Sequence, residues 1–347
     1  MTKLRSRGEN IRRFILNHIE KHSADIGVFA AHHFGITRQA VNKHIQRLVV
    51  ERALVETGQT RNKSYKLVPI FESRFVYKID STLAEDIVWS NDIRPILDPM
   101  PDNVRDIWIF GFTEMFNNAI DHSGGDEIVV MIKKTAINTE ICIGDNGVGI
   151  FRKIQAALNL LDERHAVLEL SKGKLTTDPK SHTGEGIFFT SRMFDHYGIL
   201  SGGIYFSHQF GQPEDWILEN EHPCGITSVW MKLSNHTSRT SSKVFDEYAS
   251  SDDDYRFNKT VVPVALAKYG NDQLISRSQA KRLLARVELF KTVIFDFKNI
   301  DFIGQAFADE IFRVFANQHP EIDLVPIHTH ADVEKMIKRA KSGLEKI

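Results

Sequence analysis

Apolar residues recur at helical spacing over the first fifty positions. In the stretch 7–21 they form one stripe, made of Ile11, Phe14, Ile15, Leu16 and Ile19. A second short helix is expected over 28–34, where Gly35 ends it. Thr37 is a typical N-cap for a third helix, over 38–54. The chain is therefore predicted to open with three short helices.

Two short extended runs, 54–58 and 64–68, follow the third helix and flank the turn-rich sequence GQTRNKS. Three helices and then a β-hairpin is the order of elements in a winged helix-turn-helix, which this segment resembles. We therefore expect a DNA-binding domain of this kind over residues 1–70, with the third helix as its recognition helix.

The third predicted helix has polar and basic side chains on its outward face. The candidates for DNA contact are Arg38, Gln39, Asn42, Lys43, Gln46 and Arg47 on the helix, with Arg61 and Lys63 at the hairpin tip. Arg and Lys can contact guanine edges or phosphates, and Gln and Asn can pair with adenine. Residues 1–68 hold 13 basic and 5 acidic residues, so their net charge is 13 − 5 = +8, and the remainder carries −1 − 8 = −9. A basic head on an acidic body predicts a polyanionic partner for the head.

An alternative for this segment is a winged helix that serves dimerisation or protein docking, with a solvated charged face. Pairs of histidines at 18/22 and 32/33 also raise the question of a metal site. Isolated histidines are more often surface residues or satisfied by neighbours, so no metal is expected there.

Beyond residue 70 the pattern separates three stretches. Residues 71–100 read as a transition, because three prolines fall close together before the next helix. The Ser/Thr/Asp-rich stretch 234–258 reads as a second linker. Residues 260–343 alternate strand-like and helical segments, which predicts a small α/β domain. The expected domains are accordingly 71–235 and 256–347.

The sequence FTEMFNNAIDHS at 112–123 combines an apolar helix face with a polar stripe. Glu114, Asn118 and His122 fall four apart, so they stack along one face of a helix. An amphipathic helix has no structural need for such a stripe beside its buried face, which raises the question of a functional site.

Glycine-rich turns follow this helix at two places. A predicted strand at 140–145 ends at Asp145, and Gly147 and Gly149 come directly after it. The sequence HTGEGIFF at 182–189 is a second glycine-rich turn that opens a helix. Each feature alone is typical of a tight turn or a helix edge. Their order and spacing together indicate a site.

This order resembles the GHKL ATP-binding fold, the Bergerat α/β sandwich of gyrase, histidine kinases, MutL-type repair proteins and anti-sigma-factor serine kinases. The resemblance covers residues 102–233. The matching positions are Glu114, Asn118, Ala119 and His122 on the helix, Asp145, Gly147 and Gly149 in the first glycine box, Gly184, Gly186 and Ile187 in the second, and Gly225 and Thr227 on the final strand.

The resemblance implies ATP and Mg²⁺ as cofactors and a role for each motif. Asn118 would be the helix ligand of a Mg²⁺ ion that bridges the phosphates, since magnesium takes oxygen ligands and few protein contacts. Glu114 would activate the attacking water or hydroxyl, and Asp145 would accept a hydrogen bond from the adenine amine. The turn at Gly184 and Gly186 would direct backbone N–H groups at the phosphates.

The segment 151–182, between the two glycine boxes, is expected to be the lid over the nucleotide. Lys172, Lys174 and Lys180 are candidates for phosphate contact, with a solvated loop as the alternative for each. A conventional histidine kinase carries a phosphohistidine-bearing helix pair before this domain. A winged helix and a linker occupy that place here, so autophosphorylation on histidine is not expected.

The run 292–315 resembles the STAS-like domains of anti-sigma-factor antagonists, and more closely an uncharacterised STAS-like family with the sequence I-G-Q-A-F-A-D-E. Antagonists present a phosphorylatable serine at the turn where this chain has Gly304 and Gln305, so the hydroxyl is missing. A docking module and a signalling role both stay open, as do a protein partner for this domain and a homodimer.

The composition mainly excludes classes of protein, such as membrane-spanning and disulfide-rich secreted ones. Hydrophobic residues make up 42% and charged residues 26%, as in ordinary soluble domains. No apolar run approaches the roughly 18 residues of a membrane span, and the basic start lacks the apolar core of a secretory signal. Two cysteines, Cys142 and Cys224, favour a reducing cytoplasm over a disulfide framework. We expect a cytoplasmic protein without membrane contact.

These features predict a multidomain α/β regulator of transcription, in which a Mg-ATP switch with slow hydrolysis is coupled to a DNA-binding winged helix. The alternative is a serine/threonine protein kinase that resembles anti-sigma-factor kinases. Glu114 does not distinguish the two, because water and a protein hydroxyl need the same base. The missing acceptor serine favours the switch.

Overall fold

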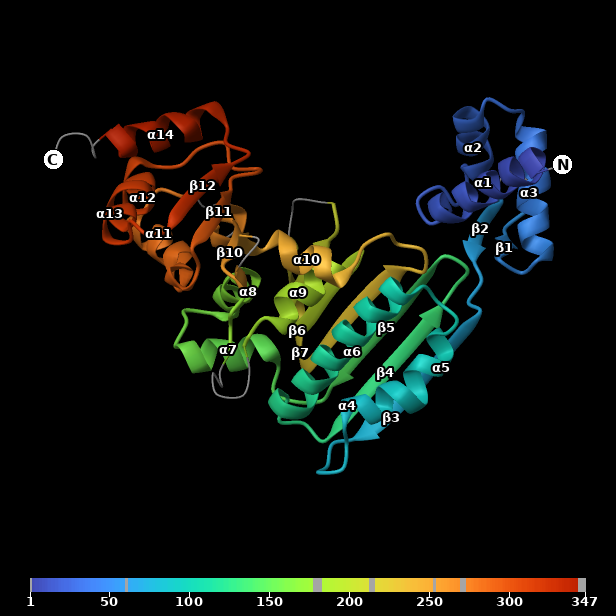
Figure 1. The fold of residues 1–347 in the computed structure, drawn as a ribbon, viewed down its shortest axis with the longest axis horizontal. Coiled ribbons are helices and arrows are strands. Elements are labelled where there is room, and N and C mark those ends of the chain that lie inside the picture. Colours follow the sequence, from blue (N-terminus) through green and yellow to red (C-terminus); the bar gives the residue numbers. More distant parts are fainter. Residues whose placement is uncertain are drawn as a thin grey trace.

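The computed structural model describes residues 2–59, 62–176, 183–211, 216–251, 254–268 and 273–342. Three units follow one another along the chain (Figure 1). A small N-terminal unit and a C-terminal α/β unit stand at opposite ends of a central unit that is built on a sheet.

Within its described residues, the N-terminal unit consists of three helices and a hairpin of antiparallel strands. Its elements are α1 (Thr2–His18), α2 (Ile26–Phe34), α3 (Arg38–Val50), β1 (Leu54–Thr57) and β2 (Ser64–Leu67). The structure confirms the predicted order of elements. It also confirms Thr37 as the N-cap of α3, because its hydroxyl accepts a hydrogen bond of 3.2 Å from the Ala40 N–H.

The core of the N-terminal unit is a cluster of its own. Ile15, Ile26 and Val41 are fully buried, and Leu54 from the hairpin closes the cluster from below the helices. None of its members belongs to the larger cluster that the rest of the described chain forms.

The described residues of the central unit form a five-stranded antiparallel sheet in the order β3-β4-β5-β7-β6. The strands are β3 (Phe71–Lys78), β4 (Glu127–Lys134), β5 (Asn138–Asp145), β6 (His196–Gln209) and β7 (Trp216–Ser234). Helix α6 (Asp102–His122) lies across one face of the sheet (Figure 1), and buries Trp108, Phe112 and Phe116 against it.

Residues 71–100, predicted to be a transition at the start of the 71–235 domain, are folded elements of the central unit. Strand β3 is the edge of the sheet, and α4 (Glu85–Val88), a π-helix (Trp89–Ile93) and α5 (Arg94–Leu97) follow it. Trp89, Ile93 and Leu97 are buried in the core. Two of the three prolines stand where helices begin, since Pro95 is in the first turn of α5 and Pro101 precedes α6.

The second predicted linker, 234–258, is also packed in its described part. It contains α10 (Ser241–Glu247) and the strands β8 (Ala249–Ser251) and β9 (Asp254–Phe257). Val244, Tyr248 and Phe257 are buried among the aromatic residues of the central unit. The polar composition of this stretch reflects its outer face, and these three side chains anchor its inner face.

The C-terminal unit confirms the predicted alternation of strands and helices. Parallel strands lie in the order β10-β11-β12. The elements are β10 (Lys259–Pro263), a 3-10 helix (Val264–Ala267), α11 (Arg277–Leu284), a second 3-10 helix (Val287–Leu289), β11 (Thr292–Asp296), α12 (Gln305–Asp309), a π-helix (Glu310–Phe315), α13 (Ala316–Gln318), β12 (Asp323–Ile327) and α14 (Ala331–Ser342).

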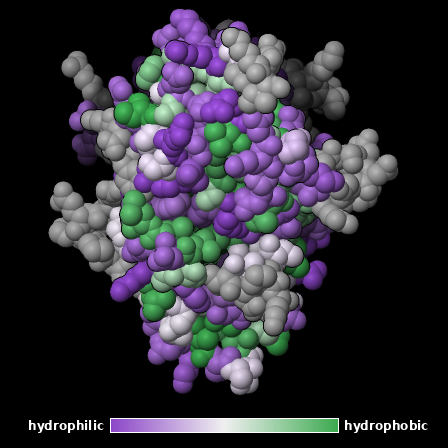
Figure 2. Space-filling view, turned by 90° about the vertical axis from the view of Figure 1, so that its left-hand side faces the viewer, coloured by the Kyte–Doolittle hydropathy of each residue, from purple (hydrophilic) through white to green (hydrophobic). Residues whose placement is uncertain are grey.

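The central and C-terminal units share one hydrophobic cluster. The ring centroid of Phe257 lies 4.6 Å from that of Phe188 in the central unit and 5.2 Å from that of Phe290 in the C-terminal unit. Seen from the end where the C-terminal unit lies, hydrophilic side chains separate the hydrophobic patches of the surface (Figure 2). Among the described residues, no helix has both the length and the apolar character that a membrane crossing requires.

Candidate functional site

A cavity of about 290 Å³ opens beside α6, between the sheet and the segments that follow β5. Its walls include α7 (Ile150–Leu158), the end of α8 (Glu163–Lys172) and the start of α9 (Gly186–Met193). The predicted site residues that line it are Glu114, Asn118, His122, Asp145, Gly184, Gly186, Ile187 and Thr227. Residues from three separate sequence motifs therefore meet at one cavity.

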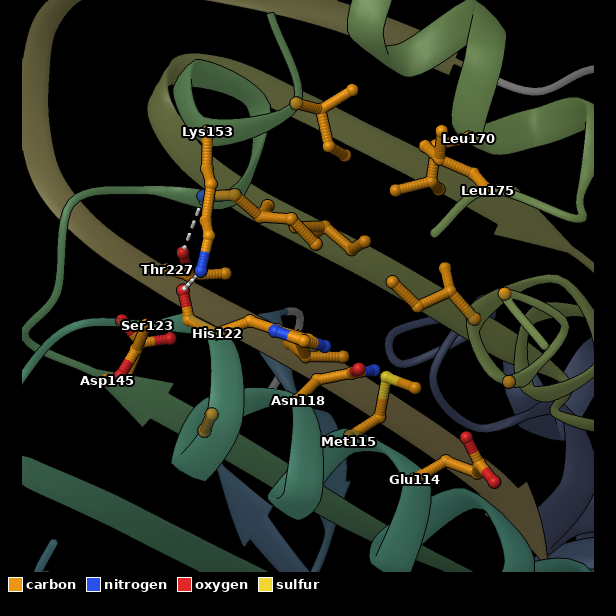
Figure 3. A pocket seen from close by; sticks show the side chains of 18 of the residues that line it. Glu114, Met115, Asn118, His122, Ser123, Asp145, Lys153, Leu170, Leu175 and Thr227 are labelled. Carbon is orange, nitrogen blue, oxygen red and sulfur yellow. Dashed lines mark hydrogen bonds between the residues drawn. The ribbon is translucent and has the colours of Figure 1, made fainter. Parts of the chain in front are cut away.

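The polar stripe of α6 forms the floor of this cavity. Figure 3 shows Glu114, Asn118 and His122 along the helix, with Asp145 and Thr227 near one end of the cavity and Glu114 near the other. All three stripe residues are partly buried, so they are neither fully exposed to solvent nor part of the hydrophobic core. The stripe faces a cavity of nearly the size that small-molecule sites usually have.

The Asp145 end of the cavity is preorganised by hydrogen bonds. The Asp145 carboxylate accepts a bond of 2.9 Å from the Gly147 N–H. Burial raises the pKa of Asp145, and the backbone bonds from Gly147 and Thr227 offset part of that effect. The Thr227 hydroxyl accepts a bond of 3.1 Å from the Ile150 N–H and lies 3.3 Å from the Ser201 hydroxyl. A carboxylate and a hydroxyl thus stand at fixed positions on adjacent strands.

Gly147 and Gly149, which match the first glycine box, do not line the cavity. A Cβ on Gly147 would lie 2.1 Å from the Ser123 carbonyl oxygen, and Gly149 has a φ of +90°. Gly147 therefore lets the turn after β5 pass close to the end of α6, and Gly149 supplies the positive φ of that turn beside Ser201. They affect the shape of the backbone around the site and do not line the cavity itself.

The Glu114 end of the cavity is formed by the second glycine-rich turn. A Cβ on Gly186 would lie 1.8 Å from Glu114 Oε2, so the carboxylate lies against the first residue of α9. Gly184 has a φ of +72°, and its carbonyl accepts a bond of 3.1 Å from the Leu175 N–H. This bond joins the described residues that come before 177–182 to those that follow it.

Sequence reasoning missed Lys153, which also lines the cavity. Its ammonium donates a hydrogen bond of 2.7 Å to the His122 carbonyl, near the end of α6 (Figure 3). A cation there is favourable, because the last carbonyls of a helix carry partial negative charge. The spacing did hold a signal, since Lys153 comes one turn after Gly149 on a helix whose other face is apolar.

Two of the predicted phosphate-binding lysines point elsewhere. Lys172 is fully buried and donates to Glu169 at 2.7 Å, and Lys174 donates to the Leu289 carbonyl at 2.9 Å. Neither residue lines the cavity. Both side chains are directed at the C-terminal unit, so the phosphate contact is wrong for these two, and Lys180 lies outside the described residues.

The predicted DNA-contacting residues lie on an exposed face of α3 or on the hairpin. The exposed ones are Arg38, Gln39, Asn42, Lys43, Gln46, Arg47 and Lys63. Arg47 pairs with Glu51 at 2.7 Å, and Lys63 pairs with Glu56 at 2.7 Å. Arg61 lies outside the described residues. The start of α3 therefore offers a surface of polar and basic side chains, whereas acidic neighbours partly neutralise its end.

The cavity offers few protein ligands for a metal ion. No group of three or more His, Cys, Asp or Glu side chains with metal-binding geometry occurs among the described residues. Asn118 and Glu114 place an amide oxygen and a carboxylate one turn apart on the same wall. Magnesium commonly keeps several waters and takes one or two protein oxygens plus phosphates, which matches this donor set.

Comparison with known proteins identifies the C-terminal unit. A family model described as a STAS-like domain of unknown function (DUF4325) matches residues 279–334. The C-terminal unit contains a STAS-like domain. The match runs from α11 into α14 and includes the whole of β11 and β12. No curated protein and no solved structure matches the chain.

Proposed function

We propose that the chain is an ATP-binding transcriptional regulator, in which a GHKL-type Mg-ATP site is coupled to a DNA-binding winged helix. One observation carries the proposal. Three motifs that are far apart in the sequence, at 114–122, 145 and 184–187, line a single cavity whose two ends differ in chemistry.

The two ends of the cavity suit the two ends of ATP. Asp145 and Thr227 supply a fixed acceptor and a hydroxyl for the adenine base. The start of α9, at Gly186, supplies backbone N–H groups and a partial positive charge for the phosphates. Asn118 lies between the two ends, where its amide oxygen would take one position on a magnesium ion. The ion would neutralise charge on the transferred phosphoryl group.

Glu114 is the group proposed to act on the nucleophile. Its carboxylate is at the phosphate end of the cavity, one helical turn from Asn118. A carboxylate there can accept the proton of a water molecule as the water attacks the γ-phosphorus. Hydrolysis then converts ATP to ADP and phosphate, and release of the phosphate leaves the chain with ADP bound.

The N-terminal unit supports the DNA-binding half of the proposal. The order α1-α2-α3-β1-β2 is that of a winged helix, and the exposed start of α3 carries Arg38, Gln39, Asn42 and Lys43. The net charge of 13 − 5 = +8 over residues 1–68 favours a polyanion. Docking α3 in a major groove would bring these side chains to base edges.

Titration calorimetry with Mg-ATP tests the nucleotide site. We expect the unmodified chain to bind Mg-ATP and Asn118→Ala to lose most of that affinity. Asn117→Ala is the matched control, because Asn117 is the neighbouring partly buried asparagine of α6 and does not line the cavity. Equal affinity of the two variants would contradict the assignment of Asn118.

Incubation with γ-labelled ATP and cell extract separates the switch from a protein kinase. We expect the label as free phosphate, with Glu114→Ala removing most but not all of its release. A labelled protein in place of free phosphate would favour the serine/threonine kinase alternative, since the same carboxylate can activate a hydroxyl.

A further inference from the structure

Residues 163–176, which we call the coupling segment, have two faces with different neighbours. Leu170, Leu175 and Thr176 line the cavity. The opposite face of the same segment packs on the STAS-like domain and is bonded to it at several points. A structural element that forms part of a binding site and of a domain interface is positioned to link the two.

The centre of the interface is a buried ion pair. Lys172 is 0% exposed, and its ammonium donates to Glu169 at 2.7 Å, to the Ala285 carbonyl at 2.7 Å and to the Arg282 carbonyl at 3.3 Å. All three donors of the ammonium are thereby used. The two carbonyls are at the end of α11, in the STAS-like domain.

Arg286 joins the same network from the STAS-like side. Its guanidinium donates to Glu169 at 3.3 Å and also to the Lys174 carbonyl. Burial alone would raise the pKa of Glu169, but hydrogen bonds and the charges of Lys172 and Arg286 outweigh it, so the pKa is lowered and the carboxylate stays charged. Removing one member of such a network leaves a buried charge poorly compensated.

Further bonds hold both ends of the coupling segment. The Thr260 hydroxyl on β10 donates to the Lys172 carbonyl at 2.7 Å. Lys174 donates to the Leu289 carbonyl and lies 4.8 Å from the ring centroid of Phe290. Arg164 donates to the Lys268 carbonyl at 3.3 Å. A shift of the cavity wall would therefore break contacts with the C-terminal unit.

The contact with the N-terminal unit is weaker in kind. Lys232 of the central unit donates to Glu20, which follows the end of α1, at 2.8 Å and pairs with Glu140 at 3.0 Å. Glu20 and Glu140 are exposed by 49% and 40%, and such ion pairs contribute little in water. Among the described residues, the buried polar contacts of the coupling segment are made with the STAS-like domain.

We infer that the STAS-like domain responds to occupancy of the cavity. Binding of a nucleotide in the cavity and packing of this domain on the coupling segment are energetically linked. The inference rests on the proposed function for the identity of the ligand. A nucleotide that contacts Leu175 and Thr176 orders the coupling segment. The other face of this segment carries Lys172 and binds Arg286 of the STAS-like domain. Linkage then requires the interface to change nucleotide affinity by the same factor as the nucleotide changes the interface.

Hydrogen exchange on the full chain, with and without Mg-ATP, tests this link. We expect Mg-ATP to slow exchange at the cavity and also over residues 282–289, which face the coupling segment. We further expect Arg286→Ala to abolish the slowing at 282–289 and to weaken Mg-ATP binding about tenfold, within the range of about 5- to 150-fold typical of allosteric coupling. Arg277→Ala is the matched control, since Arg277 is in the same domain and pairs with Asp309 and Glu310.

Slowed exchange at the cavity with none at 282–289, or equal Mg-ATP affinity of the Arg286 and Arg277 variants, would overturn the link and leave the proposed function standing. No slowing at the cavity itself would instead contradict the proposed function. Thr260→Val provides a second variant if Arg286→Ala does not fold. It removes one bond to the coupling segment while it keeps the shape of the side chain, and it should weaken Mg-ATP binding in the same direction.

Discussion

Gly186→Ala tests the geometry at the Glu114 end of the cavity with a single methyl group. The new Cβ would lie 1.8 Å from Glu114 Oε2, and real Cβ atoms do not approach other atoms within 3.0 Å. The carboxylate must therefore move by at least 3.0 − 1.8 = 1.2 Å. The fold can tolerate that movement, because the clashing atom is the end of a flexible side chain and alanine is a better helix former than glycine.

The magnitude follows from the role proposed for Glu114. A misplacement of about 1 Å can cost about 100-fold in rate, which is about 2.7 kcal/mol of transition-state stabilisation. We expect turnover of ATP to fall by about that factor, with the melting temperature almost unchanged and Mg-ATP affinity reduced far less than turnover. Steady-state release of phosphate, calorimetric affinity and thermal melting measure the three quantities.

A double-mutant cycle shows whether the methyl group acts through the carboxylate. In the Glu114→Ala background there is no carboxylate to displace, so adding Gly186→Ala should cause no further loss of turnover. Parent-level turnover in the Gly186→Ala variant would refute the placement of Glu114 as the base. A loss that persists undiminished in the Glu114→Ala background would show that the turn acts on the phosphates directly.

Two further predictions concern other parts of the chain. Arg38→Ala should weaken binding to a specific DNA site by about 1–3 kcal/mol and relax its sequence preference. Arg74→Ala, at an exposed position of strand β3, should leave both unchanged in the same gel-shift titration. Binding independent of salt would argue for a docking role, because phosphate contacts release counterions. The Cys142 thiol should resist alkylation at pH 8 in the native chain and react after denaturation, as followed by peptide mass mapping. The reason is that burial raises the pKa of this thiol to about 12, so the thiolate fraction is small. Rapid alkylation of the native chain would contradict that burial.

The sequence was most informative where structure is decided locally. The stripe of Glu114, Asn118 and His122 needs only the period of a helix, and the structure places all three on one wall of the cavity. The capping of α3 by Thr37 and the alternation of the C-terminal strands and helices are local in the same sense. Short-range periodicity and cap chemistry determine such features, so they can be predicted from neighbouring residues.

The errors arose where distant partners decide the outcome. The carbonyls that accept from Lys172 are 110 and 113 positions away in the chain, so its burial has no local signal. The predicted linker at 234–258 is similar, because Tyr248 and Phe257 find their aromatic partners on α9. Polar composition describes the outer surface of such a stretch and does not reveal the few side chains that anchor it.

The division of the buried side chains into two clusters sets the cooperativity of unfolding. The N-terminal cluster, with Ile15 and Val41 at its centre, has no member in common with the cluster that extends from α6 to α14. Each cluster defines a unit that gains or loses its structure as a whole, so heating should give one transition for the N-terminal unit and another for all the rest. A cut after residue 70 would leave two folded pieces, whereas a cut before β10 would separate Phe257 from Phe290 and expose one half of a shared interior.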